Sequence, residues 1–139
     1  MPNWTNEIQK IMSDRFGHDT LLALATVDST GMPSVRTVNA FYENGAFYII
    51  TYALSSKMQQ IRQNSAVAVC GDWFSAHGIA SCLGYVCAPE NLQIANKLRL
   101  AFSSWYDNGH INEKDPNTCI LKISITDGVL FSDGMRYSI

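Results

Sequence analysis

The chain has 139 residues, of which 47% are hydrophobic and 16% charged, as in one packed domain and unlike a disordered segment. Ten lysine and arginine residues against twelve aspartate and glutamate residues give a net charge of −2. This balance argues against a nucleic-acid or anionic-membrane partner, because both usually select a basic surface. We therefore expect a single domain over residues 1–139.

Neither a secretory signal nor a bilayer-spanning apolar segment is visible, so we expect a cytoplasmic protein without a membrane partner. The four cysteines form no C-x-x-C pair, and the three histidines are not spaced as metal ligands, so no metal site is predicted. Three cysteines lie in apolar runs, which predicts buried, reduced thiols. The cysteines are Cys70, Cys82, Cys87 and Cys119.

The first predicted element is an amphipathic helix that ends at Phe16. Thr5 is a suitable N-cap, and Gly17 a suitable stop. Apolar side chains recur at helical spacing and form one stripe that covers a core. These are Trp4, Ile8, Ile11, Met12 and Phe16.

Three antiparallel strands are predicted next. Leu21–Val27 is a continuous apolar run, consistent with a buried strand. Residues 34–41 then alternate between two faces, with Arg36 and Val38 on one face and Thr37 on the other. Asn44-Gly45 predicts a tight hairpin to a third strand over residues 46–51.

The remaining elements complete a mainly β (α+β) fold. We expect a short helix from Ser55 or Ser56, and a helix that opens at Pro89 with Leu92 and Trp105 or Tyr106 on its buried side. Strands are predicted over 66–74, 77–87, 118–126, 129–131 and 135–138, with a polar loop over 107–117. Asp127-Gly128 and Asp133-Gly134 predict hairpins. Six to seven antiparallel strands with about three flanking helices favour a closed or nearly closed β-barrel.

One group of residues predicts an anion site. Ser55-Ser56-Lys57 opens a helix, where free backbone N–H groups and the helix dipole favour a phosphate. Arg36 lies in the middle of an otherwise uncharged strand that pairs with the strand leading into this helix. The two cations can therefore converge on one anion. The alternative is a solvated Arg36 and an ordinary serine cap followed by a surface lysine.

The order of these residues resembles the pyridoxamine 5′-phosphate oxidase-like family, the FMN-binding split barrels. The resemblance rests on Arg36-Thr37-Val38, a Phe-Tyr-x-x-Thr strand over 47–51, Ser55-Ser56-Lys57 and a later Trp73. It implies an antiparallel split β-barrel and a homodimer with FMN at the subunit interface. By this resemblance the phosphate is held by Arg36, Ser55, Ser56 and Lys57. The flavin ring lies along Thr37, Val38, Asn39 and Thr51.

Departures from the family pattern refine the expectation. Phe41 and Ile79 stand where the full oxidases carry a lysine and a glutamine, and Ser56 where they carry an arginine. The chain is therefore more similar to the short general-stress and flavin-reductase-like members than to true pyridoxamine phosphate oxidases. His77 is expected to be satisfied in the barrel or at an interface, and the aromatic residues Trp73, Phe74, Trp105 and Tyr106 to serve packing before flavin stacking.

The function expected from this resemblance is an FMN-dependent oxidoreductase. It would act on a small organic substrate and take electrons from a reduced nicotinamide or a similar donor. The flavin supplies the redox chemistry, so no catalytic side chain is assigned. Two alternatives stay open: a non-catalytic flavin- or haem-binding module, and a ligand-free barrel that serves as a protein-interaction domain.

Overall fold

A computed structural model describes residues 4–139 and begins with the predicted helix, α1 (Asn6–Phe16). The side chain of Thr5 caps the helix by accepting a hydrogen bond from the Ile8 backbone N–H at 3.2 Å. Ile8, Met12 and Phe16 are buried. The apolar stripe read from the sequence therefore covers the barrel core, as predicted.

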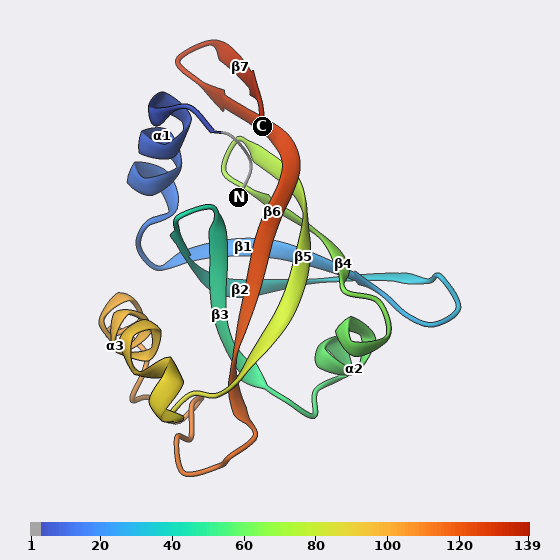
Figure 1. Cartoon of the computed structure of the whole chain (residues 1–139), viewed down its shortest axis with the longest axis vertical. Helices are drawn as coiled ribbons and strands as arrows, with labels where there is room; N and C mark the ends of the chain where they lie inside the picture. Colours follow the sequence, from blue (N-terminus) through green and yellow to red (C-terminus); the bar gives the residue numbers. More distant parts are fainter. Residues whose placement is uncertain (1–3) are drawn as a thin grey trace.

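Six antiparallel strands close into a barrel, and a seventh strand pairs outside it (Figure 1). Hydrogen-bonded neighbours follow the order β3-β2-β1-β4-β5-β6-β7, and pairing of β3 with β6 closes the barrel. The chain order is β1 (Thr20–Val27), β2 (Pro33–Glu43), β3 (Ala46–Tyr52), α2 (Ser56–Gln63), β4 (Ala66–Gly71), β5 (Phe74–Tyr85), a 3-10 turn (Pro89–Asn91), α3 (Leu92–Ala101), β6 (Thr118–Ser132) and β7 (Met135–Ser138). The expected barrel with three helices is confirmed.

The barrel is split between β2 and β3. These strands pair only at the hairpin, from Phe41 opposite Tyr48 to Glu43 opposite Ala46. From Pro33 to Ala40, β2 pairs with β1 on its other edge, while β3 pairs with β6 along its length. The β2 edge that faces β3 therefore carries backbone N–H and C=O groups without a strand partner.

Two apolar clusters flank the sheet. The larger fills the barrel with α1 on one side and includes Met58 and Ile61 of α2. The smaller lies between β6 and α3 and contains Leu98, Phe102 and Ile120. In Figure 1, α1 and β7 lie at one end of the barrel, and α2 and α3 flank the other end. The split opens between the latter two helices.

The predicted hairpin at Asp127-Gly128 is wrong. Both residues lie within β6, which continues from Thr118 to Ser132 beside β5. Gly128 allows β5 and β6 to lie close together, because a Cβ at this position would lie 2.5 Å from the Ser75 carbonyl oxygen. The other two hairpin dipeptides, Asn44-Gly45 and Asp133-Gly134, do form turns with positive φ at both residues.

Three further expectations need correction. The β4–β5 turn lies at Asp72-Trp73, not between residues 74 and 77, and Trp73 adopts φ +51°. Leu92, expected on the buried side of α3, is exposed, because the 3-10 turn at Pro89 shifts the start of the regular helix. Among the cysteines only Cys119 is buried, since the other three lie at strand ends or on the outer barrel face.

Within residues 4–139, every helix is too short or too polar to traverse a bilayer.

Candidate functional site

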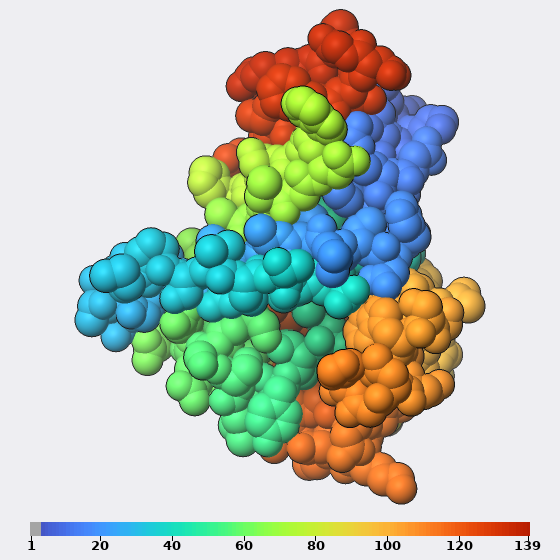
Figure 2. Space-filling view, turned by 180° about the vertical axis from the view of Figure 1, so that it is seen from behind, coloured from blue at the N-terminus to red at the C-terminus, as the bar shows by residue number. Residues whose placement is uncertain are grey.

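A cavity of about 480 Å³ occupies the split between β2 and β3. Val38 and Asn39 of β2 form one wall, and Thr51 and Lys57 lie across from them. Residues 105–111, which follow α3, form a third wall. Figure 2 shows this hollow where the cyan strand β2, the green segment around residues 49–57 and the orange loop meet. A cavity of this size is in the range that accommodates a small molecule or cofactor.

Lys57 is held in the cavity wall as a partly buried cation. Its ammonium donates a hydrogen bond to the Thr51 hydroxyl, and it forms no ion pair with any carboxylate of residues 4–139. Burial lowers the pKa of Lys57, and the nearby charge of Arg36 lowers it further. A bound anion would relieve this repulsion.

Arg36 lies on the inner face of β2 beneath α2. One guanidinium nitrogen donates to the Thr26 hydroxyl at 2.7 Å and to the Leu24 carbonyl at 3.2 Å. The Thr26 hydroxyl in turn donates to Gln60 of α2 at 2.5 Å. The guanidinium is therefore oriented from both β1 and α2, and none of the described carboxylates pairs with it. Partial burial lowers the pKa of Arg36.

The structure brings four of the eight predicted residues together in the cavity wall: Val38, Asn39, Thr51 and Lys57. The other four lie outside that wall. Arg36 is close enough to Lys57 to affect its pKa, and Thr37 is exposed on the outer face of β2. Ser55 caps α2 by accepting from the Met58 N–H at 3.4 Å, and Ser56 is the exposed first residue of the helix.

Sequence reasoning missed one wall of the cavity, formed by Trp105, Asn108, His110 and Ile111. Trp105 packs on Phe102 and donates its indole N–H to Asp19 at 2.8 Å, so it combines packing with a place in the cavity lining. The Asn108-Gly109 dipeptide marked a loop. Only the fold shows that this loop turns toward the split.

Glu113 holds this loop in place. Its carboxylate accepts two hydrogen bonds from Arg99 of α3, at 2.8 and 3.0 Å, and a third from the Tyr106 hydroxyl. Chiefly because of Arg99, the pKa of Glu113 is lowered to about 2. The Tyr85 hydroxyl donates to the Glu113 backbone carbonyl. The loop is thus attached to α3 through Arg99 and to β5 through Tyr85.

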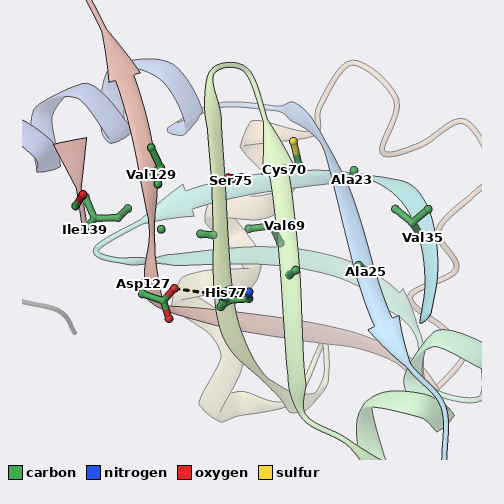
Figure 3. Close-up of a pocket in the computed structure, with 14 residues that line it drawn as sticks. Ala23, Ala25, Val35, Val69, Cys70, Ser75, His77, Asp127, Val129 and Ile139 are labelled. Atoms are coloured by element: carbon green, nitrogen blue, oxygen red, sulfur yellow. Dashed lines mark hydrogen bonds and ion pairs between the residues drawn. The ribbon is translucent and has the colours of Figure 1, made fainter. Parts of the chain in front are cut away.

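A second hollow, of about 540 Å³, lies on the outer face of β1, β4, β5 and β6 (Figure 3). Its lining consists of small or apolar residues, including Ala23, Ala25 and Ala68, apart from one histidine–aspartate pair. In that pair, the imidazole of His77 lies 2.8 Å from the carboxylate of Asp127. His77 is therefore partnered, as expected. None of the predicted cofactor residues lines this hollow.

Comparison with known proteins agrees with this geometry. Residues 8–130 match the family described as pyridoxamine 5′-phosphate oxidase. The chain belongs to this family. Comparison with curated protein sequences gave no match.

Solved structures related to this pyridoxamine 5′-phosphate oxidase family chain share its fold at low sequence identity. General stress protein 26 from Bacillus anthracis str. Sterne is 19% identical, with a TM-score of 0.70 and coverage of 96% of this chain and 99% of that one. The haem storage protein HutZ from Vibrio cholerae is 15% identical, with a TM-score of 0.66 and coverage of 86% and 88%. A pyridoxamine 5′-phosphate oxidase-related, FMN-binding protein from Nostoc punctiforme is 17% identical, with a TM-score of 0.60 and coverage of 100% and 97%.

Proposed function

We propose that the split between β2 and β3 binds FMN and that the protein is an FMN-dependent oxidoreductase. The observation that carries the proposal is the pair of cations Arg36 and Lys57, which lie at the split near each other and without a carboxylate partner among residues 4–139. A phosphate would neutralise both. Ser55 and Ser56, at the start of α2, would add hydroxyl and backbone donors.

The unpaired edge of β2 suits the flavin ring. From Thr37 to Asn39 the backbone on this edge has no strand partner. A flavin ring carries both hydrogen-bond donors and acceptors along one side, so it can pair with a strand edge as another strand would. The Asn39 side chain is already oriented by a 2.9 Å hydrogen bond to Asp19, and Thr51 borders the same cavity.

When bound, FMN would supply the electron transfer, and this chain's residues would position it and leave one side of the cavity for a substrate. The loop residues Asn108 and His110 line the third wall of the cavity. They are therefore the groups expected to contact a small organic substrate or a reduced nicotinamide donor.

We infer that the active form is a homodimer that uses the outer face of β1, β4 and β5. The hollow on this face is lined by alanine, valine and other small residues where a water-facing sheet usually carries polar side chains. Val35 of β2, 70% exposed, borders the same face. Because β2 also forms the wall of the split, a second copy seated here would approach the cofactor cavity.

The second candidate is a non-catalytic haem- or flavin-binding module. HutZ, with the same fold, is a haem storage protein. His110 places an imidazole, a common haem ligand, in the cavity wall. Oxidation of a reduced nicotinamide by the FMN-loaded protein would favour the enzyme. Tight haemin binding that His110→Ala abolishes, without turnover of any donor, would favour the module.

Titration with two flavins tests the site directly. FMN and riboflavin share the ring and differ in the phosphate, so only FMN binding depends on the two cations. Lys57→Met should weaken FMN binding by roughly 10- to 150-fold, the equivalent of about 1.5–3 kcal/mol for one charge-assisted contact, and leave riboflavin binding unchanged.

The matched control is Lys10→Met, which removes a lysine that pairs with Asp14 on the exposed face of α1. It should leave both affinities unchanged. Equal losses for FMN and riboflavin in Lys57→Met, or no loss for either, would show that the phosphate does not lie at Lys57.

A further inference from the structure

Two cysteine side chains face the barrel interior from adjacent strands. Cys119 of β6 belongs to the barrel core together with Leu121 and Ile123 and is 2% exposed. Cys82 of β5 pairs with Leu121, so its side chain projects from the same face of the sheet as Leu121. Cys82 and Cys119 are therefore diagonal neighbours across the β5–β6 ladder.

The environments of the two thiols differ. Cys82 is exposed at the barrel end, whereas Cys119 is buried. Burial and the neighbouring Cys82 thiol raise the pKa of the Cys119 thiol to about 12. One thiol is thus open to small solutes, and its diagonal neighbour is a buried, protonated thiol. A first oxidation product at Cys82 would have a resolving partner within reach.

A cross-link between these strands requires a small backbone shift, and a β-bulge lies next to Cys82. Diagonal neighbours lie about 7–8 Å apart between Cα atoms, and a disulfide requires about 4.4–6.8 Å, so β5 must shift by roughly 1 Å. The β5–β6 register shifts between Cys82 and Gly84, which leaves Leu83 without a ladder partner. Gly84 has φ +91°, and no heavy atom lies within 4 Å of the position that a Cβ would take, so there is open space on that side of the bulge.

We propose that Cys82 and Cys119 form a redox-sensitive pair that a hydroperoxide converts to an intramolecular disulfide across β5 and β6. The Cys82 sulfur attacks the peroxide, the O–O bond breaks, and a sulfenic acid and an alcohol or water form. The Cys119 sulfur then attacks the sulfenic sulfur, the sulfenic S–O bond breaks, and the hydroxyl leaves as water with the proton of the Cys119 thiol as the S–S bond forms. The two thiols lose two electrons and two protons in total, and the hydroperoxide is reduced.

The cross-link would lie next to the proposed phosphate site. Cys119 is directly opposite Thr51 on the β3 side of β6, and Thr51 accepts the hydrogen bond of Lys57. The formation of the disulfide itself does not depend on FMN binding. Its test therefore uses the protein without added flavin, and its failure leaves the proposed function untouched.

The test uses a Cys70→Ser, Cys87→Ser background, in which Cys82 and Cys119 are the remaining thiols. After treatment with hydrogen peroxide, intact-mass analysis should show the loss of two hydrogen atoms per chain, reversed by dithiothreitol. Peptide mapping under non-reducing conditions should link the Cys82 and Cys119 peptides. Adding Cys119→Ala should abolish the link and leave a Cys82 sulfenic acid that dimedone captures.

Two results would overturn the proposal. One is equal dimedone labelling of Cys82 with and without Cys119, in the absence of a linked peptide. The other is a disulfide that joins two chains and not two strands of one chain. A thermal melt of each variant before oxidation establishes that it is folded. If Cys119→Ala does not fold, the peptide map of the folded background alone decides between a linked and an unlinked pair.

Discussion

Replacing Glu113 with glutamine would test how loop 107–117 is held against the rest of the protein. The carboxylate accepts two hydrogen bonds from Arg99, at 2.8 and 3.0 Å, and one from the Tyr106 hydroxyl. Glutamine preserves the shape and one acceptor oxygen but removes the charge and the two-pronged contact with the guanidinium. The variant should therefore fold, with a weakened attachment of the loop to α3.

The expected magnitude follows from the lowered pKa of Glu113, which is about 2 against an ordinary value of 4.5. At 1.36 kcal/mol for each pKa unit, this lowering of the Glu113 pKa corresponds to roughly 3 kcal/mol of folding free energy. The side chains of Arg99 and Glu113 are both about 30% exposed, so solvent screening reduces the contribution of their contact to about 1–2 kcal/mol. Because the folded-state pKa is depressed, this stabilisation is present above about pH 4.5 and is lost as the pH falls toward 2.

Urea unfolding of wild type and Glu113→Gln at a series of pH values measures this contribution. At pH 7 the variant should be less stable by about 1–2 kcal/mol, and the difference should shrink below pH 4.5. The matched control is Glu43→Gln, which breaks a single, more exposed contact with Lys97 and should cost under about 1 kcal/mol. A difference that does not change with pH, or one no larger than that of Glu43→Gln, would refute the argument.

Three further substitutions address the orientation of Arg36, the strand contacts and the dimer. Thr26→Val removes a fully buried hydroxyl that forms hydrogen bonds with both Arg36 and Gln60. Urea unfolding should show that the free energy of unfolding falls by about 1–2 kcal/mol, whereas Thr26→Ser, which keeps the hydroxyl, should largely avoid this loss. Gly128→Ala would place a Cβ 2.5 Å from a carbonyl oxygen of β5. The clash should destabilise the fold by about 1–3 kcal/mol and lower the thermal unfolding midpoint by several degrees. An unchanged midpoint would show that β5 adjusts freely. Ala68→Arg places a charge in the small-residue hollow and should convert the proposed dimer to monomers in sedimentation velocity; an unchanged dimer mass would rule out this face as the interface.

Local sequence signals predicted most elements of the fold. The stripe of α1, its Thr5 cap and the Asn44-Gly45 hairpin depend on interactions within a few residues, and each is present. The alternation along β2 predicted that Arg36 and Thr37 face opposite sides, and they do. Such signals succeed because backbone dihedral preferences and the side-chain period of a strand are properties of short segments.

Errors arose where tertiary packing overrode a local preference. Asp127-Gly128 carries a typical turn dipeptide, yet pairing with β5 keeps β6 continuous through it. The β4–β5 turn places Trp73 at positive φ, a position that residue type alone disfavours. Three of the four cysteines are exposed although an apolar residue type predicts burial. In each case, neighbours distant in sequence decide the outcome.

The sequence alone determined helix α1, the hairpins at Asn44-Gly45 and Asp133-Gly134 and the two candidate cations, because each follows from residue type and short-range spacing. The tertiary structure decided the split between β2 and β3, the proximity of Arg36 to Lys57 and the turn of the 105–111 loop toward the same cavity. It also made Cys82 of β5 a diagonal neighbour of the buried Cys119 of β6. These features depend on how the ladder closes and where the helices pack, and those contacts join segments that lie far apart along the chain.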